Sequence, residues 1–308
     1  MATATVIDIG SNTIKVLVAT QVSPSGDLTV LKTKTIEARI SAGISHSSPV
    51  LSDEAITRGL AAIKDLLKEA SIYSSDSTVL VATSAVRDAL NGPFFCAQIL
   101  KETGYTVRIL SGEEEANGIG RGLLCDPLLK SISNFMVFDL GGGSLECLNF
   151  VDRKITQKVS LPLGCVRLTE IFVSDPSSAF EASAAISEHV KEVIKKSGFI
   201  FTPAVVTVGT GGTLTSARAI LALKSGLTLE ASSATLSIKA LKEISYTLSV
   251  MPLKERLNVP GLPKGRADVF PAALETLIAL SELAHVENFH HSLYNLRWGL
   301  ASEALSRA

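Results

Sequence analysis

A short sequence pattern that occurs twice constrains the fold of this chain most strongly. Near the N-terminus residues 6–13 read VIDIGSNT, and at mid-chain residues 137–144 read VFDLGGGS. Each copy is an apolar, strand-like run that ends near an aspartate, followed by a turn of small residues and a second β-prone run. The two aspartates, Asp8 and Asp139, are 131 positions apart. That spacing is too long for a solenoid repeat and indicates a duplicated domain.

The composition is that of a chain with two packed domains. Of its 308 residues 46% are hydrophobic, and strand-like and helix-like segments mix in both halves, which favours the α/β class. We expect an N-terminal domain over residues 1–124, on which the C-terminal helix can pack back, and a second domain over residues 125–308.

Charge, hydropathy and cysteine spacing argue against several other classes. The formal net charge of −1 gives no case for nucleic-acid binding, and without a run of about 18 apolar residues no membrane span is expected. The N-terminus lacks the charged segment and long apolar run of a signal peptide, so we expect a cytoplasmic protein. The four cysteines have no CxxC or CxxH spacing, and we expect buried free thiols.

Capping residues and helical periodicity predict several helices. Ser52 is a suitable N-cap for a helix over residues 53–70, in which apolar side chains recur at helical spacing. Further helices are expected to begin near Ser84 and Ser111. From Leu236 to the C-terminus the chain reads as mostly helical.

The first turn of the repeated pattern has the residues of a phosphate site. Its glycine allows a close approach of the backbone to a ligand, and successive N–H groups of such a turn can form an anion-binding nest. The phosphate-binding candidates are Gly10, Ser11, Asn12, Thr13 and Lys15. The alternative is an ordinary hairpin turn, because the sequence Asp-x-Gly-Ser is common.

The second turn gives a stronger signal. Three consecutive glycines are costly in backbone entropy, and a plain hairpin does not need them, whereas a backbone wrapped around phosphate oxygens does. The phosphate-binding candidates here are Gly141, Gly142, Gly143 and Ser144. Asp139 and Glu146 are two hard oxygen ligands that could share a divalent cation. The alternative for Glu146 is an exposed strand carboxylate.

A third turn of small residues, GTGGT over residues 209–213, follows a strand and opens a helix. Helix N-termini favour anions, which makes Gly211 and Gly212 further phosphate-binding candidates. The turn fits neither the Walker A pattern nor the pattern GxGxxG.

Two other places could supply catalytic groups. The acidic run from Glu113 to Glu115 opens a predicted helix, so simple end-capping is one interpretation and a general base for an attacking water is the other. Arg87 follows a short strand, which places its guanidinium where ligands of α/β sheets bind, although a surface arginine is the plainer interpretation. His290 and His291, in the C-terminal helical stretch, are expected to be a solvated or partly buried pair and no metal site.

Taken in order, these segments resemble the exopolyphosphatase/guanosine pentaphosphate phosphatase (Ppx/GppA) family. The resemblance covers nearly the whole chain and is carried by residues 8–18, 39–40 with Gly43, 83–89, 111–116, 137–146, 161–170, 208–218 and 266–268. It implies two related actin-like domains, of the sugar kinase/Hsp70 type with a ribonuclease H-like core, on either side of a cleft. It also implies hydrolysis of a terminal phosphoanhydride with a divalent metal, usually Mg²⁺, with Mn²⁺ as an alternative.

The resemblance also assigns roles to individual residues. The glutamate directly before the alanine of the SGEEEA segment activates water in the family's pattern, and it maps to Glu115. The arginine of TSAVRDA contacts substrate phosphate and maps to Arg87. The metal acids map to Asp139 and Glu146, with Asp8 as a further candidate ligand.

This chain departs from the family's pattern in three places. The family's Leu-Gly-Glu-Gly segment is here residues 40–43, ISAG, so an acid is missing, and the C-terminal Gly-Leu-Arg-Glu-Gly motif appears as NLRWG over residues 295–299. Lys15 stands where arginine is often found. Polyphosphate and guanosine pentaphosphate both stay open as substrates, as does a homodimer. The rival hypotheses are an ATP-dependent kinase of the same superfamily and a non-catalytic nucleotide or polyphosphate sensor.

Overall fold

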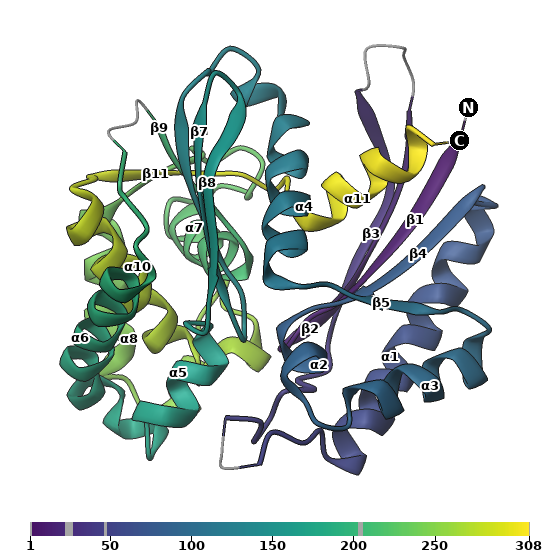
Figure 1. The fold of residues 1–308 in the computed structure, drawn as a ribbon. Helices are drawn as coiled ribbons and strands as arrows, with labels where there is room; N and C mark the ends of the chain where they lie inside the picture. Colours follow the sequence, from purple (N-terminus) through teal and green to yellow (C-terminus); the bar gives the residue numbers. More distant parts are fainter. Residues whose placement is uncertain (1, 22–26, 46–47, 203–205, 308) are drawn as a thin grey trace. The chain divides into compact units, whose positions relative to one another are not determined.

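Two mixed α/β units make up the chain in the computed structural model, which describes residues 2–21, 27–45, 48–202 and 206–307 (Figure 1). Unit 1 comprises Met1–Ser131 and Tyr294–Ala308, and unit 2 comprises Ile132–Leu293. The first boundary therefore lies after residue 131 and not after residue 124. The short 3₁₀ helix η2 (Pro127–Leu129) belongs to unit 1, because Leu129 is buried and the next residue, Lys130, pairs with Asp27. As the sequence allowed, the C-terminal helix returns to unit 1.

The sheet of unit 1 has the strand order β3-β2-β1-β4-β5. Its strands are β1 (Thr3–Ile9), β2 (Thr13–Gln21), β3 (Leu28–Glu37), β4 (Ser77–Ala82) and β5 (Val107–Ile109). The hairpin strands β1, β2 and β3 pair antiparallel, whereas β4 and β5 run parallel to β1. β1 and β2 are buried on both faces, as expected for apolar central strands covered by helices.

Helices cover both faces of this sheet (Figure 1). Those of unit 1 are α1 (Asp53–Ala70), η1 (Ser71–Tyr73), α2 (Ser84–Asp88), α3 (Gly92–Thr103), α4 (Gly112–Leu124) and α11 (Leu296–Leu305). On one face Ile7 and Ile9 pack with the buried residues of α1 and α3. Because side chains alternate along a strand, the buried Val6 faces the other way, toward the face on which α11 contacts β1 and β2. The predicted cap of α1 is confirmed, since the Ser52 side chain accepts a hydrogen bond from the Ala55 amide.

The sheet of unit 2 has the order β10-β11-β9-β6-β7-β8. Its strands are β6 (Phe135–Leu140), β7 (Leu145–Val151), β8 (Lys154–Leu161), β9 (Val206–Thr210), β10 (Thr235–Ser237) and β11 (Asn288–His291). The run β8-β7-β6-β9 repeats the run β3-β2-β1-β4 of unit 1, with the same antiparallel hairpin and the same parallel neighbour. The duplicated sequence pattern therefore corresponds to a duplicated sheet topology.

The helices of unit 2 pack against this sheet around one apolar core. They are α5 (Cys165–Phe172), η3 (Pro176–Ser178), α6 (Ala179–Ser197), α7 (Gly212–Lys224), α8 (Ile238–Ser249), α9 (Leu253–Arg256), η4 (Lys264–Arg266) and α10 (Phe270–Ala284). In the part of the chain that the structure describes, no helix is long and apolar enough to cross a membrane.

Two further expectations need correction. His290 and His291 lie on β11 and not on a helix, because this short segment pairs in parallel with β9 and antiparallel with β10. All four cysteines are free thiols, but only Cys147 and Cys165 are buried, whereas Cys96 and Cys125 are partly exposed. Burial raises the pKa of the Cys147 thiol well above its ordinary value, so this side chain packs as a small neutral group.

Candidate functional site

The first turn joins β1 to β2 as a tight hairpin. The Gly10 amide donates to the Thr13 carbonyl over 3.1 Å, and a methyl group on Gly10 would lie 3.0 Å from that same oxygen. Ser11, Asn12 and Thr13 are buried. Lys15 lies directly opposite Asp8 in the antiparallel register, so both side chains project from the same face of the sheet. Asp8 and Lys15 are thus neighbours across the hairpin, and Asp8 as a further metal ligand stays a prediction.

The second turn joins β6 to β7 with the same backbone hydrogen bond, from the Gly141 amide to the Ser144 carbonyl over 3.0 Å. Its carbonyl groups accept hydrogen bonds from backbone amides of the first turn of α5. The Cys165 amide donates to Gly141 over 3.0 Å, and the Val166 amide donates to Gly142 over 2.8 Å. Because N–H and C=O of a peptide unit point in opposite directions, this arrangement turns the amides that follow these carbonyls away from α5.

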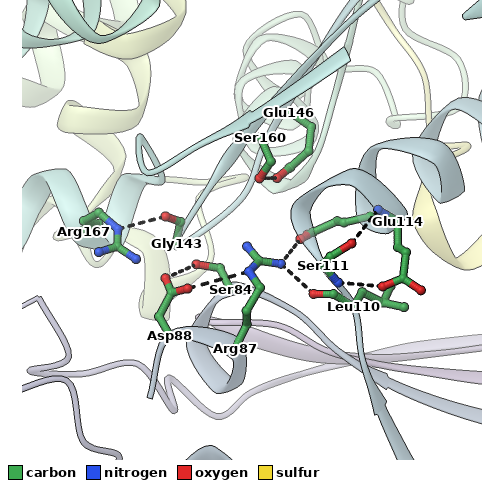
Figure 2. A network of polar contacts seen from close by, with 11 residues as sticks. Ser84, Arg87, Asp88, Leu110, Ser111, Glu114, Gly143, Glu146, Ser160 and Arg167 are labelled. Carbon is green, nitrogen blue, oxygen red and sulfur yellow. Dashed lines mark hydrogen bonds and ion pairs between the residues drawn. The ribbon is translucent and has the colours of Figure 1, made fainter. Parts of the chain in front are cut away.

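Two residues at the start of α5, for which the sequence suggested no individual role, also support the second turn. A methyl group on Gly164 would lie 2.3 Å from the backbone nitrogen and carbonyl carbon of Gly143, so only glycine fits there. The guanidinium of Arg167 donates through Nε to the Gly143 carbonyl over 3.1 Å (Figure 2). The sequence signal was the LPLGCVR segment, which follows β8 directly.

The two predicted metal acids lie on neighbouring strands. Asp139 and Glu146 are direct partners in the antiparallel register of β6 and β7, so their side chains project from the same face. Glu146 is 2% exposed, and its Oε1 accepts a hydrogen bond of 2.7 Å from the Ser160 hydroxyl on β8 (Figure 2). Two directly opposed carboxylates repel each other, and a cation between them would remove that repulsion.

The third turn lies next to Asp139. Thr210 pairs with Asp139 across the parallel β6–β9 ladder, and a methyl group on Gly211 (φ 96°) would lie 2.8 Å from the Oδ1 atom of Asp139. The hydroxyls of Thr210 and Thr213 are buried and have no hydrogen-bond partner among the described residues. Such orphaned polar atoms mark a place where a bound ion or water is expected. The guanidinium of Arg266 lies against Gly212, since a methyl there would be 2.0 Å from Nη2.

The donor set in unit 2 fits a hard divalent cation that keeps most of its water. No group of three or more His, Cys, Asp or Glu side chains gathers anywhere in the described ranges. Proteins usually bind Mg²⁺ through one or two carboxylates, and water and phosphate oxygens complete the coordination. The pair Asp139 and Glu146 matches that requirement, with Thr210 as a neighbouring hydroxyl.

Arg87 and Glu115 form an ion pair in unit 1. The Nη1 atom of Arg87 lies 2.9 Å from Oε2 of Glu115. The same atom donates to the Leu110 carbonyl over 3.0 Å (Figure 2). Glu115 is 7% exposed, in the first turn of α4. On its other side, the Nε atom of Arg87 lies 3.7 Å from Oδ1 of Asp88. Sequence reasoning gave no role to Asp88 or to the Leu110 carbonyl, which together orient the arginine.

The three acids that open α4 have separate roles. Glu114 forms a capping box with Ser111, in which the Ser111 amide donates to Glu114 Oε2 over 2.8 Å and the Glu114 amide donates to Ser111 Oγ over 3.1 Å (Figure 2). The hydrogen bond from the Ser111 backbone, and to a lesser extent that with its side chain, lowers the pKa of the Glu114 carboxyl. End-capping is therefore the role of Glu114, whereas Glu113 is exposed and Glu115 pairs with Arg87.

The strand ends bring these groups together within each unit. β1, β4 and β5 are parallel neighbours, so the first turn, Arg87 on α2 and Glu115 on α4 all follow the carboxyl ends of adjacent strands. In unit 2 the second and third turns follow the carboxyl ends of the adjacent strands β6 and β9. Unit 1 thus carries an arginine, an acid and a phosphate-type turn, and unit 2 carries two acids and two such turns.

Comparison with known proteins gives consistent matches over nearly the whole chain. The model of the Ppx/GppA phosphatase family matches residues 17–308. The crystal structure of an exopolyphosphatase from Cytophaga hutchinsonii superposes with a TM-score of 0.89 at 22% identity, covering 99% of this chain and 98% of that one. The Aquifex aeolicus member of the Ppx/GppA family superposes with a TM-score of 0.80 at 24% identity, with the same coverage. An exopolyphosphatase-like protein gives a TM-score of 0.87 at 24% identity.

These likenesses bear on the sequence expectations to different degrees. Two related α/β domains of the actin-like type are confirmed. The roles of the individual site residues, the metal and the cleft between the domains stay predictions.

Proposed function

Because the chain belongs to the Ppx/GppA phosphatase family, we propose that it hydrolyses a terminal phosphoanhydride bond and releases inorganic phosphate. The proposed substrates are inorganic polyphosphate, guanosine pentaphosphate or both. The observation that carries the proposal is the ion pair of half-buried Arg87 with buried Glu115 at the carboxyl edge of the unit 1 sheet. A carboxylate oriented beside a guanidinium can accept a proton from water while the guanidinium binds the phosphate that the water attacks.

Phosphoryl transfer depends mainly on positioning and electrostatic stabilisation. In unit 1 the amides of the first turn, Lys15 and Arg87 would bind the oxygens of the terminal phosphate. Glu115 would orient the attacking water and take its proton. Since Arg87 is held by the Leu110 carbonyl and lies beside Asp88, its guanidinium is preorganised for that task.

In unit 2 the second and third turns would bind phosphate oxygens of the substrate. Asp139 and Glu146 would hold a divalent cation, Mg²⁺ or alternatively Mn²⁺, whose charge would offset that of the anhydride oxygens. Ser160 would keep Glu146 oriented through its hydrogen bond of 2.7 Å. The buried hydroxyl of Thr210 and the opposed pair of acids are the features that support this assignment.

The test is a phosphate-release assay on the purified chain, with polyphosphates of several lengths and guanosine pentaphosphate side by side. The expected result is release of phosphate in the presence of Mg²⁺ without any acceptor alcohol. Transfer that requires an acceptor would favour a kinase, and tight binding without release would favour a sensor. A homodimer, which light scattering would detect, also stays a prediction.

A further inference from the structure

The segment after β3, residues 38–41, contacts the first turn through backbone and side-chain hydrogen bonds. The Arg39 amide donates to the Asn12 carbonyl over 2.9 Å, and the Ser41 amide donates to the Ser11 carbonyl over 3.2 Å. The Ser41 hydroxyl also donates to the Ser11 carbonyl, over 3.2 Å. Asn12 of the first turn and Ser41 of this segment are buried, at 3% and 2% exposed, whereas Arg39 is half-buried. The carbonyls of the first turn are thus bonded to this segment in the same way as those of the second turn are bonded to α5.

A side-chain contact determines which way the Asn12 amide is oriented. The Nε atom of Arg39 lies 3.1 Å from Oδ1 of Asn12. A guanidinium can only donate, so the atom of Asn12 that it contacts must be the oxygen, and the Nδ2 end of the amide is thereby directed elsewhere as a donor. In an anion-binding turn a donor is the useful end, because phosphate oxygens accept hydrogen bonds.

The backbone at Arg39 indicates that this contact comes at a cost to the fold. Its φ is 40°, in the left-handed region that side chains other than glycine rarely adopt. Arg58 supports this conformation by donating from Nε to the Ala38 carbonyl over 3.1 Å and from Nη2 to the Arg39 carbonyl over 3.3 Å. Glycine would adopt the same φ without strain, so an arginine at this strained position points to a role of its side chain outside folding.

We propose that Arg39 is a positioning residue for substrate binding, which orients the Asn12 side-chain amide toward a phosphate oxygen. This inference rests on the proposed function only in taking the ligand of the first turn to be a phosphate chain. It predicts that stability and binding respond in opposite directions when Arg39 is changed. A residue with a merely structural role would lower both or neither.

The experiment compares Arg39→Gly with the wild type in urea unfolding and in calorimetric titration with tripolyphosphate. Two series of titrations are made, one without a divalent cation and one with Ca²⁺ in place of Mg²⁺. The expected result is a higher urea midpoint together with about tenfold weaker tripolyphosphate binding. Ser74→Gly is the matched control, because Ser74 is an exposed non-glycine residue of the same unit with φ 46°. It should raise the midpoint and leave the affinity unchanged.

A double-mutant cycle shows whether Arg39 acts through Asn12. Asn12→Ala alone should lose as much affinity as Arg39→Gly, and the double variant should lose no more than Asn12→Ala alone. Arg39→Lys keeps the charge but not the Nε donor, and should bind as weakly as Arg39→Gly. Additive losses, wild-type affinity of Arg39→Gly or full affinity of Arg39→Lys would each overturn the assignment.

The same data separate this inference from the proposed hydrolysis. A wild type that binds tripolyphosphate but releases no phosphate refutes hydrolysis, while the affinities of the variants still decide the role of Arg39. A wild type that binds no tripolyphosphate under any of these conditions overturns the role of Arg39 as well.

Discussion

Replacing Gly122 by alanine should loosen the contact between α4 and α11. The sign of the change in stability shows whether the two backbones are in close contact there. A methyl group at this position would lie 2.0 Å from the Asn295 carbonyl oxygen and 3.1 Å from the Gly299 amide nitrogen. Both are backbone atoms and cannot rotate away. The change matters for the site because α4 carries Glu115 in its first turn, and α11 packs against α4 (Figure 1).

Two effects of opposite sign compete at Gly122. Alanine in place of glycine inside a helix stabilises a protein by about 1 kcal/mol. Inserting a methyl into a well-packed contact costs about 1–3 kcal/mol, and a clash with backbone belongs at the upper end of that range. The net expectation is a loss of about 2 kcal/mol in the free energy of unfolding of unit 1.

Gly118 supplies the matched control on the same helix face. A methyl there would lie 2.5 Å from Cδ1 of Leu296, the far end of a side chain that can change rotamer. Gly118→Ala should therefore be close to neutral, since the gain in helix propensity offsets a small repacking cost. The two substitutions are chemically identical and differ only in what the added methyl meets.

The assay is urea unfolding followed by the fluorescence of Trp298, the single tryptophan of the chain. This residue lies on α11, is 8% exposed and has its ring centroid 4.2 Å from that of Tyr294. Its signal therefore reports whether α11 is docked. A Gly122→Ala midpoint equal to or above that of the wild type would refute the close backbone contact of α4 with α11.

Two further predictions concern unit 2. Burial, and then the charges of Arg218 and His290, lower the pKa of His291 from 6.5 to about 4. As pH falls, the unfolded chain binds the proton first, so stability is complete above pH 6.5 and falls by about 3 kcal/mol on approach to pH 4. Urea midpoints measured across this range should lose most of that pH dependence in His291→Gln. The control His285→Asn should keep it, and asparagine is chosen there because it tolerates the positive φ of His285, 52°. An unchanged pH dependence in His291→Gln would contradict the assignment. Gly164→Ala, whose methyl would lie 2.3 Å from Gly143 backbone atoms, should displace the second turn and weaken phosphate binding at least tenfold; calorimetric titration with tripolyphosphate that gives wild-type affinity would show that the turn tolerates the displacement.

Features with a local signal could be predicted from the sequence. The hairpin on each side of a small-residue turn, the Ser52 cap and the helix start at Ser111 follow from alternation, turn chemistry and capping within a few residues. The opposed arrangement of Asp139 and Glu146 also follows from a hairpin, because a tight turn sets the register of the two strands.

Features that depend on distant segments could not be predicted in this way. β11 has only four residues and becomes a strand through pairing with β9 and β10, so its own sequence carries no alternation to detect. The support of the second turn by Gly164 and of the first turn by Arg39 depends on tertiary contacts between segments more than twenty positions apart. For the same reason the role of Glu114 could not be separated from that of Glu115 before the direction of each side chain was seen.

The central claim is that Glu115 activates water for the release of phosphate, and the rate of phosphate release by Glu115→Gln tests it most directly. The substitution keeps the shape of the side chain but removes the base, so turnover of polyphosphate under Mg²⁺ should fall by about 10²-fold or more while binding is retained. Glu113→Gln, in the same helical turn but exposed, should keep wild-type turnover. Near-normal turnover of a folded Glu115→Gln protein would contradict the account.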